Sequence, residues 1–413
     1  MADKLRIGVV GCGGFAKSFV PLFQNHPNVE YVCVTDLMTE RAQDYHERFG
    51  VDVIDTYEKM LESDVNCIAV FVQRHLHGPI VIKALEAGKH VYCAVPMAST
   101  VEECKRIVEL VKEKHLTYMM GETCYYYPCA CFCRKMYKEG KFGKFVYGAS
   151  QYYHDIAEFG FLVETEGYRW RQAAAGLPPF LYPTHSFGMI LSSVDAHVVK
   201  LSCMGYRDTE DDNIYGEGKN DWNNPYSNMY ALCQLSNGGT ARVTEARRIG
   251  VFKPSSYISA VYGTHAGYEY SNAQHLFVEA PGKEKAKLTD VSDLVNPREM
   301  TEHKNDPDFK EQVANAAWSW SSTAPIQYTD HLPESFKDLP NGHMATHKLL
   351  IDDFCRAAYE NKLPVVSAWE AARYTIPGIV AVESAYQGGV LMDVPDLGDA
   401  PADWERIDAK TEA

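Results

Sequence analysis

The sequence predicts an α/β protein with an N-terminal doubly wound parallel sheet and a C-terminal α+β domain built on a large open, mainly antiparallel sheet. Before Gly121, short apolar runs alternate with helix-like stretches, which is the β-α-β rhythm of a parallel sheet. After Gly121, strand-like runs follow one another with few helices between them, which favours antiparallel pairing. We therefore expect one domain over residues 1–124 and a second over residues 125–413, with the C-terminal helices within 347–388 packing back on the body.

Glycine and apolar residues mark the start of the first expected sheet. Residues 5–10, Leu-Arg-Ile-Gly-Val-Val, form a buried strand, and a glycine turn and a helix-like stretch to Phe23 follow it. Apolar runs at 29–34 and 67–72 supply further strands. Thr100-Val-Glu-Glu103 has the capping-box pattern that begins a helix. This order predicts parallel strands joined by helices.

The second domain is predicted to be a strand meander that two helices complete. The expected strands cover 145–153, 197–206, 229–235, 240–247 and 257–262. Ser236-Asn-Gly-Gly239 has the composition of a hairpin turn between two of these strands. Polar segments 208–228 and 296–341 are expected loops, and 347–360 and 368–386 are expected helices. A sheet of this kind leaves one face for a substrate or a partner subunit.

Charge and composition exclude several classes of protein. The 40 Lys and Arg residues against 55 Asp and Glu residues give a net charge of −15, which disfavours nucleic acid and anionic membranes as partners. No apolar run approaches the ~20 residues that span a membrane, and no signal-peptide pattern precedes the first strand. We expect a cytoplasmic protein.

The 12 cysteines are expected to be reduced thiols. Cys33 and Cys67 lie inside apolar runs, where a free thiol acts as a small hydrophobic side chain. Cys129, Cys131 and Cys133 follow an i, i+2 spacing without a Cys-x-x-Cys pair, so a helix with small side chains is favoured over a zinc or iron–sulfur site. We therefore expect no metal.

A dinucleotide-binding motif lies between the first strand and the helix-like stretch that follows. Gly11-x-Gly13-x-x-Ala16 stands in this context, and Asp36 follows the next strand. Gly11 permits the tight turn, Gly13 lets the backbone approach a pyrophosphate, and Ala16 keeps helix and strand close. A carboxylate at Asp36 would accept hydrogen bonds from ribose hydroxyls and repel a 2′-phosphate, so NAD is favoured over NADP.

With these residues in place, the chain resembles the glucose–fructose oxidoreductase / inositol dehydrogenase / rhizopine catabolism (Gfo/Idh/MocA) family. The resemblance rests on this Rossmann start, on His77 before the stretch 84–91, on Pro96, and on the late stretch 382–389. It implies a Rossmann domain, bound NAD(P), sugar or cyclitol substrates, and homo-oligomers, dimers or tetramers, formed through the open sheet. The residues expected at the cofactor are Gly11, Gly13, Gly14, Phe15, Ala16, Asp36, His77, Val95, Pro96 and Glu122.

Two positions depart from the pattern of the family's dehydrogenases. Those enzymes carry Glu-Lys-Pro after the fourth strand, where this chain reads Ala94-Val95-Pro96, so the lysine is missing. Leu181 stands four residues before His185, where the dehydrogenases have an aspartate. Oxidation of a neutral hydroxyl needs a base with a suitable pKa, so the departure leaves ordinary dehydrogenase chemistry open to question.

A glycosidase branch of the same superfamily provides a second resemblance. Val95-Pro96, Glu122, Tyr152-Tyr-His154-Asp155 and Tyr182-Pro-Thr-His185 are similar to stretches of NAD-dependent α-N-acetylgalactosaminidases. In that branch NAD oxidises a ring carbinol, the anomeric substituent is eliminated, water adds, and the hydride returns. The resemblance therefore implies redox-neutral glycoside cleavage.

Proton-handling side chains gather in these stretches. The expected catalytic residues are His185 as the principal acid/base, Tyr182, His154 and Asp155, and the expected substrate-binding residues are Tyr152, Arg169, Arg171 and His347. Structural roles are the alternative for these side chains. His185, flanked by Thr184 and Ser186, would then only form hydrogen bonds with its neighbours, and Glu122, expected at the cofactor, would instead cap the next helix.

Three functions remain open at this stage. The first is an NAD-dependent enzyme that exchanges a hydride between a ring carbinol and NAD, as the opening step of oxidation–elimination glycoside cleavage. The second is a simple sugar or inositol dehydrogenase, and the third is a non-catalytic relative that binds NAD(H) or a sugar. The sequence favours an enzyme, because clustered polar groups are costly to hold in a cleft without a use. It leaves open the sugar, the net reaction, the replacement for the missing lysine at Val95, and the oligomer size.

Overall fold

The structure is a computed structural model that divides into two compact units. It describes residues 4–155, 171–250, 255–271, 274–280, 286–298, 305, 307 and 322–407. The first unit lies within Met1–Thr123, Tyr328–Ala372 and Leu397–Thr411, and the second lies within Cys124–Gln327 and Arg373–Asp396.

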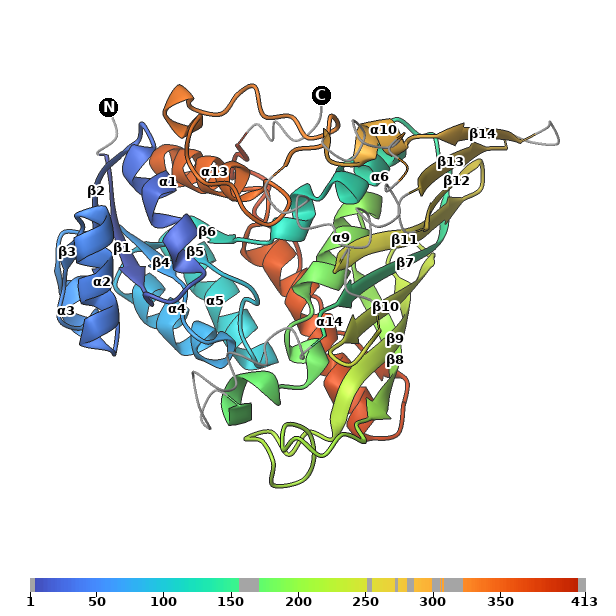
Figure 1. Ribbon diagram of the computed structural model, residues 1–413, viewed down its shortest axis with the longest axis horizontal. Coiled ribbons are helices and arrows are strands. Elements are labelled where there is room, and N and C mark those ends of the chain that lie inside the picture. Colours follow the sequence, from blue (N-terminus) through green and yellow to red (C-terminus); the bar gives the residue numbers. More distant parts are fainter. Residues whose placement is uncertain are drawn as a thin grey trace. The chain divides into compact units, whose positions relative to one another are not determined.

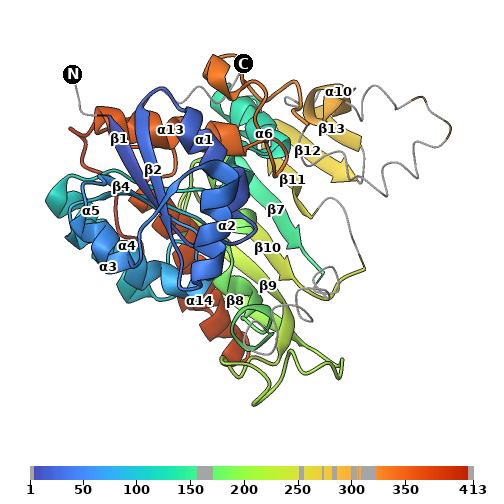
Figure 2. The same cartoon turned by 60° about the vertical axis from the view of Figure 1, so that its left-hand side comes forward.

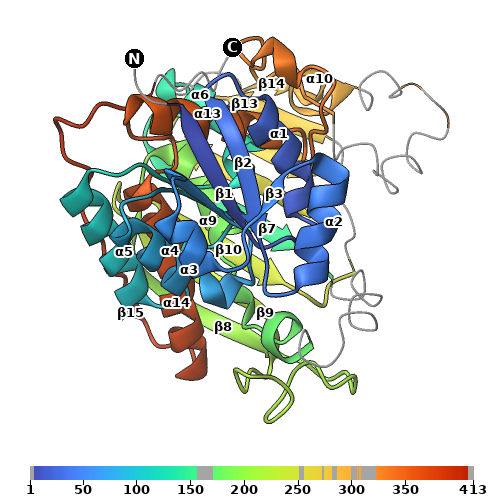
Figure 3. The ribbon, with the colours of Figure 1, turned by 90° about the vertical axis from the view of Figure 1, so that its left-hand side faces the viewer.

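A six-stranded parallel sheet forms the centre of the first unit (Figures 1 and 3). Its strands are β1 (Leu5–Val10), β2 (Val29–Thr35), β3 (Asp52–Val53), β4 (Cys67–Val70), β5 (His90–Cys93) and β6 (Tyr118–Met120). They lie in the order β3-β2-β1-β4-β5-β6, and every pairing is parallel. The order reverses between β1 and β4, so the carboxyl ends of these strands border the position where this fold binds dinucleotides. The predicted doubly wound sheet is confirmed.

Helices join these strands in the order that the sequence predicts. They are η1 (Ala16–Ser18), α1 (Val20–Asn25), α2 (Thr39–Phe49), α3 (Tyr57–Glu62), η2 (Arg74–Leu76), α4 (His77–Glu86) and α5 (Val101–Lys114). The stretch after the glycine turn is not one helix: it is a 3₁₀ turn followed by α1, in which Pro21 occupies the first turn. Proline lacks an N–H and is tolerated there because the first N–H groups of a helix have no intrahelical acceptor.

The first unit also contains the late helix α13 (His347–Glu360), preceded by η8 (Glu334–Phe336). Residues 347–360 are predicted from the sequence to belong to the second domain, whereas in the structure they lie in the first unit. In the structure, Thr117 Oγ1 donates a hydrogen bond to the carbonyl oxygen of Ala357, and His26 Nε2 lies 3.3 Å from Asp352 Oδ1. These contacts join residues that are more than two hundred positions apart, which no local sequence pattern records.

The second unit is built on a nine-stranded mixed sheet (Figures 1 and 2). Its strands are β7 (Phe145–Tyr153), β8 (Val198–Arg207), β9 (Tyr226–Leu235), β10 (Thr240–Ala246), β11 (Ser256–Gly263), β12 (Ala266–Ser271), β13 (Gln274–Glu279), β14 (Lys287–Asp290) and β15 (Met392–Asp393). The order is β14-β13-β12-β11-β7-β10-β9-β8-β15, with β7 and β10 parallel and the other pairings antiparallel. The expected hairpin between β9 and β10 is present, since Gly238 N–H bonds the carbonyl of Leu235.

One face of this sheet is packed by helices, and part of the other is exposed. The helices of the unit are η3 (Thr123–Tyr126), α6 (Pro128–Lys138), η5 (Arg171–Ala175), η6 (Pro179–Leu181), α9 (Thr184–Val194), α10 (Ser292–Val295) and most of α14 (Ala368–Tyr386). Helix α9 contacts β7, β10 and β11, and α6 contacts β11. On the exposed part, Met204 lies opposite Tyr230 in the register of β8 and β9, and Leu232 follows two residues later. Their side chains are among the exposed large hydrophobic residues of the chain.

All 12 cysteines are buried free thiols, and Cys129, Cys131 and Cys133 lie on helix α6. Among the described residues, we find no helix with the length and apolarity to cross a bilayer.

Thr100→Ala is expected to destabilise the first unit. Thr100 Oγ1 accepts the N–H of Glu103, and the Glu103 carboxylate accepts the N–H groups of Thr100 and Ser99, so helix α5 begins with a complete capping box. Loss of such a cap costs about 1 kcal/mol. Urea unfolding followed by circular dichroism measures the loss, and Thr100→Ser, which keeps the acceptor, serves as the control. Equal stability of the alanine and serine variants would contradict the role of the cap.

Candidate functional site

The glycine turn after β1 has the backbone geometry that a dinucleotide site requires. Gly11 has a φ of +99°, and a Cβ there would lie 2.8 Å from the carbonyl carbon and oxygen of Phe71, so other residues are excluded. A Cβ at Gly13 or Gly14 would meet no heavy atom within 4 Å. The space above this part of the turn is therefore open, and the backbone is accessible to a ligand.

Asp36 follows β2 and is tied to the same turn. Its Oδ2 accepts the N–H of Cys12 at 2.7 Å, and its Oδ1 accepts the N–H of Met38 at 2.8 Å. Burial and the nearby Asp36 raise the pKa of Cys12 to about 12, so this thiol stays protonated. Asp36 retains partial exposure and further acceptor capacity, which suits the hydroxyls of a ribose.

Phe15 and Ala16 complete the turn, and His347 lies beside them. Ala16 is fully buried, whereas Phe15 is partly exposed. The centroid of the His347 ring, at the start of α13, lies 4.2 Å from that of the tilted Phe19 ring and 5.6 Å from that of Phe15, which it meets edge-on. Burial lowers the pKa of His347 to about 3, so the ring is neutral. The residue predicted to bind substrate thus lies in the first unit, against the cofactor turn.

His77 connects the ends of two neighbouring strands. It is the first residue of α4, and its Nδ1 and Nε2 lie 2.6 Å from the carbonyl oxygen of Pro96 and 3.1 Å from that of Val72. Val95 and Pro96, which follow β5 and are joined by a cis peptide bond, are buried. Burial lowers the pKa of His77 to about 4 although both carbonyls favour the protonated ring, so the ring is neutral near pH 7 and donates a hydrogen bond to only one of them.

Glu122 follows β6 and is fully buried. Together with the glycine turn after β1, Asp36 after β2 and Pro96 after β5, it lies at the carboxyl edge of one parallel sheet. Ligands of doubly wound sheets bind at this edge. The open glycine backbone and the Asp36 carboxylate fit the pyrophosphate and the ribose of NAD, respectively.

A second group of polar side chains lies in the second unit and contains two tyrosine–histidine pairs. Tyr152 and His154, at the end of β7, share a hydrogen bond between Oη and Nδ1. Tyr182 follows η6, and its Oη lies 3.0 Å from Nε2 of His185, near the start of α9. The Tyr152 ring centroid is 4.9 Å from that of His185 and 5.8 Å from that of Tyr182. The structure thus brings together four of the residues predicted from the sequence.

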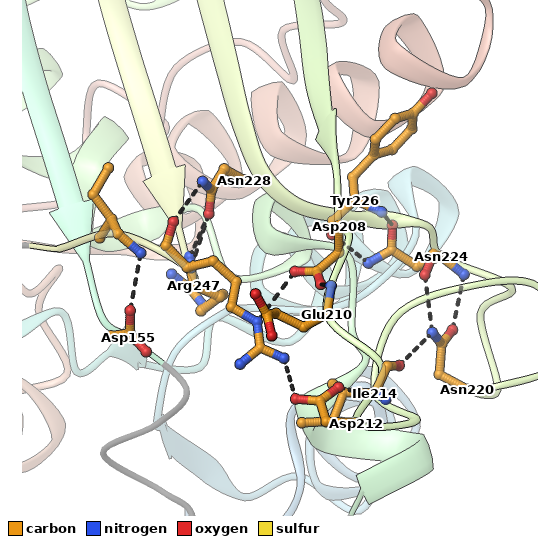
Figure 4. A network of polar contacts seen from close by, with 12 residues as sticks. Asp155, Asp208, Glu210, Asp212, Ile214, Asn220, Asn224, Tyr226, Asn228 and Arg247 are labelled. Carbon is orange, nitrogen blue, oxygen red and sulfur yellow. Dashed lines mark hydrogen bonds and ion pairs between the residues drawn. The ribbon is translucent and has the colours of Figure 1, made fainter.

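The remaining predicted residues of this unit have different positions. Asp155 Oδ2 accepts the backbone N–H of Ile249 at 2.9 Å, so this carboxylate holds the chain after β10 (Figure 4). Arg169 lies outside the described residues. Arg171 begins η5, and its side chain also lies outside the described part of the structure.

An ion pair that is not among the residues predicted from the sequence lies beneath the tyrosines. Glu245, near the end of β10, is fully buried, and its Oε2 lies 3.0 Å from Nη2 of Arg247. The Arg247 guanidinium lies 4.9 Å from the Tyr152 ring centroid and 5.9 Å from that of Tyr182. The sequence contains a pattern that indicates the buried position of Glu245. Side chains two residues apart lie on the same face of a strand, and Glu245 continues the buried row that starts with Ala241 and Val243.

Comparison with known proteins agrees with this description of the first unit. Residues 5–122 match the GFO_IDH_MocA family, described as an oxidoreductase family with an NAD-binding Rossmann fold. The chain is 23% identical over 422 residues to a glycosyl hydrolase family 109 protein of Saccharopolyspora erythraea, with 96% of this chain and 83% of the relative covered. An alpha-N-acetylgalactosaminidase of Bacteroides fragilis is 30% identical over 165 residues, which cover 38% of each chain.

Solved structures share the fold over nearly the whole chain. An oxidoreductase domain protein from Kribbella flavida has a TM-score of 0.70 at 17% identity, covering 96% of this chain and all of the other. A levoglucosan dehydrogenase in complex with NADH has a TM-score of 0.68 at 19% identity, covering 95% of this chain and 100% of the other.

These findings identify the class of protein. Residues 5–122 form an NAD-binding Rossmann domain that matches the Gfo/Idh/MocA oxidoreductase family. The cofactor of this domain is NAD.

Gly13→Ala is expected to weaken NADH binding more than tenfold without lowering stability. The added methyl group meets no protein atom, yet it occupies the space that the backbone leaves for a pyrophosphate. Isothermal titration calorimetry measures the dissociation constant, and thermal unfolding measures stability. Gly250→Ala, whose Cβ also meets nothing within 4 Å, is the matched control and should bind as the parent does. Unchanged affinity of Gly13→Ala would contradict the placement of the cofactor.

His77 is expected to make the protein less stable in mild acid. Its folded-state pKa, about 4, lies below the ordinary value of 6.5, so the unfolded chain takes up a proton first as the pH falls. The stability present above pH 6.5 is therefore lost as the pH falls from 6.5 toward 4. Between pH 7 and pH 5 the contribution is about 2 kcal/mol.

Urea unfolding of the parent and of His77→Gln at pH 7, 6 and 5 tests this dependence. The variant should lose less unfolding free energy than the parent over this range. His197→Gln, a substitution of a partly exposed histidine in the second unit, should retain the slope of the parent. Identical slopes for the parent and His77→Gln would show that His77 protonates with an ordinary pKa.

Proposed function

We propose that this protein is an NAD-dependent enzyme that oxidises a ring carbinol of a sugar or glycoside. The observation that carries the proposal is the pair of tyrosine–histidine hydrogen bonds in the second unit, Tyr152 with His154 and Tyr182 with His185. Bound NAD supplies a hydride acceptor, and the chain must supply groups that take the hydroxyl proton. Phenol–imidazole pairs are suited to that task because each can pass a proton between two titratable atoms.

The roles of the individual residues follow from this arrangement. His185 is the principal acid/base, and Tyr182, 3.0 Å away, transfers protons with it. Tyr152 and His154 form the second pair, and Asp155 fixes the backbone near Ile249. These pairs take the place of the lysine and the aspartate that family dehydrogenases carry at the positions of Val95 and Leu181.

Two net reactions are compatible with this chemistry. Redox-neutral cleavage of a glycoside is supported by the similarity to glycosyl hydrolase family 109 proteins over nearly the whole chain. It also needs acids and bases at more than one carbon, and two tyrosine–histidine pairs supply them. Net dehydrogenation of a free sugar is the second candidate, and it is supported by the fold shared with levoglucosan dehydrogenase.

Assembly and location are part of the same proposal. The exposed apolar side chains of Met204, Tyr230 and Leu232 suit a contact between copies of the sheet, so we propose a homo-oligomer formed through this face. The 12 buried free thiols suit a reducing compartment, and we propose a cytoplasmic protein.

A panel of aryl glycosides and free sugars tests the reaction class, with aglycone release and NADH absorbance recorded together. NAD-dependent release without NADH accumulation supports redox-neutral cleavage, and steady NADH formation from a free sugar supports dehydrogenation. Binding of NADH with no turnover on any member of the panel would favour the non-catalytic alternative.

His185→Asn is expected to lower kcat on the active compound at least about 100-fold, because general acid–base catalysis contributes that much. The NADH dissociation constant should stay the same. His197→Asn, in the same unit and paired with Asp396, is the control and should retain activity. Full activity of His185→Asn would remove His185 from the mechanism.

A further inference from the structure

The buried ion pair of Arg247 and Glu245 has no obvious role in stability. The exposed fraction of Arg247 is 8%, and that of Glu245 is 0%. Burying two charges costs desolvation energy that their attraction often fails to recover, so such a pair is weak evidence for stabilisation. A buried guanidinium is expected where its charge acts on a neighbouring group.

Both members of the pair are held in place. Glu245 Oε1 accepts a hydrogen bond from Ser186 Oγ at 2.5 Å, which ties β10 to α9 next to His185. The backbone N–H of Arg247 is directed at Oδ1 of Asn228, 2.9 Å away, and the Asn228 amide also bonds the backbone of Arg248 (Figure 4). The strand end that carries Arg247 is therefore fixed.

The backbone after Arg247 is fixed by charged neighbours as well. Arg248 Nε lies 3.1 Å from Asp208 Oδ2, and Arg248 also pairs with Asp212. Asp208 and Asp212 are thus paired with Arg248, and Arg247 interacts instead with Glu245 and the neighbouring tyrosines.

The Arg247 guanidinium lies close to two aromatic rings of the site, those of Tyr152 and Tyr182. The guanidinium lies 4.9 Å from the centre of the Tyr152 ring and 5.9 Å from that of Tyr182. Burial lowers the pKa of Arg247, but Glu245, Tyr152 and Tyr215 raise it, and the net effect is upward. Because the coupling is reciprocal, the permanent charge of Arg247 favours the ionised form of Tyr152.

We propose that Arg247 is a positioning residue that supplies positive charge to this site, so that Tyr152 exchanges its proton through a transient phenolate. Tyr152 Oη passes its proton to Nδ1 of His154, whose other nitrogen keeps its hydrogen. The phenolate then takes the proton of the substrate hydroxyl, and the electron pair of the broken O–H bond stays on the substrate oxygen, where it forms the new carbonyl bond. One proton thus moves from the substrate hydroxyl to His154, and Arg247 stabilises the negative charge that Tyr152 carries in between. This assignment rests on the proposed function.

Several titratable or charged groups face Tyr152. His154 lies on the same segment, Tyr182 and His185 come from the segment that begins α9, and Glu245 and Arg247 come from β10 and its end. Among these, Arg247 and Glu245 differ in sign, which allows an electrostatic role to be separated from a structural one.

Tyrosine labelled with ¹³C at Cζ allows the ionisation of Tyr152 to be followed by NMR in the full-length protein. Tyr152→Phe identifies the resonance by its loss. Arg247→Gln should raise the pH at which Tyr152 ionises, with an ionisation constant at least tenfold smaller than that of the parent. Glu245→Gln should shift it in the opposite direction, because the guanidinium is then less neutralised.

Two further variants complete the test. The double variant Glu245→Gln with Arg247→Gln leaves no lone buried charge, and its Tyr152 should ionise between the two single variants. Arg242→Gln removes an exposed charge from the same strand and should leave Tyr152 unchanged. Circular dichroism and NADH binding verify that each variant is folded.

Shifts of the same sign in both single variants, or no shift in either, would overturn the proposal, because loss of packing does not depend on the sign of the removed charge. The NMR readout needs no substrate. Opposite shifts with no turnover on the sugar panel would therefore refute the proposed function and keep the role of Arg247. Turnover on the sugar panel without opposite shifts would refute the role of Arg247 and keep the proposed function.

Discussion

Parallel pairing of β1 with both β2 and β4 is the constraint on which the cofactor site depends. In a parallel sheet, all carboxyl ends lie along one edge, so residues far apart in the chain meet there without long loops. The turn after β1 can lie against β4 only because Gly11 has no side chain where the backbone of Phe71 approaches. Asp36 then closes the arrangement by bonding Cys12 and Met38. The acidic side chain is thus part of the turn as well as a candidate ligand of the ribose.

The proposed function requires the second unit to hold proton-handling groups, because Val95 stands where the dehydrogenases that this chain resembles carry a lysine. The structure combines two tyrosine–histidine hydrogen bonds with the buried guanidinium of Arg247. A guanidinium cannot act as the base, since its pKa is too high for it to release a proton near neutral pH. Its positive charge can only favour the negatively charged form of a neighbouring group such as Tyr152. In this proposal Arg247 supplies the positive charge while Tyr152 and His154 transfer the proton, whereas a lysine would supply both.

The relatives carry two different chemistries on one fold, which limits what the fold can decide. A glycosyl hydrolase family 109 protein and a levoglucosan dehydrogenase are both similar to this chain. One fold can carry either chemistry, and the groups around the substrate determine which reaction takes place. Under the proposed function, the net reaction of this chain depends on the Tyr152 and Tyr182 pairs and their neighbours.

The sequence by itself determined the doubly wound sheet, the glycine turn and Asp36, because these depend on short-range periodicity and on residues with special backbone freedom. It also indicated Tyr182 and His185, which are three positions apart on one short segment. Only the tertiary structure decided that α13 belongs with the first unit, that His347 packs on Phe19, and that Arg247 lies beneath Tyr152. Those contacts join segments distant in the chain, and they arise from the packing of side chains in three dimensions, which local patterns do not encode.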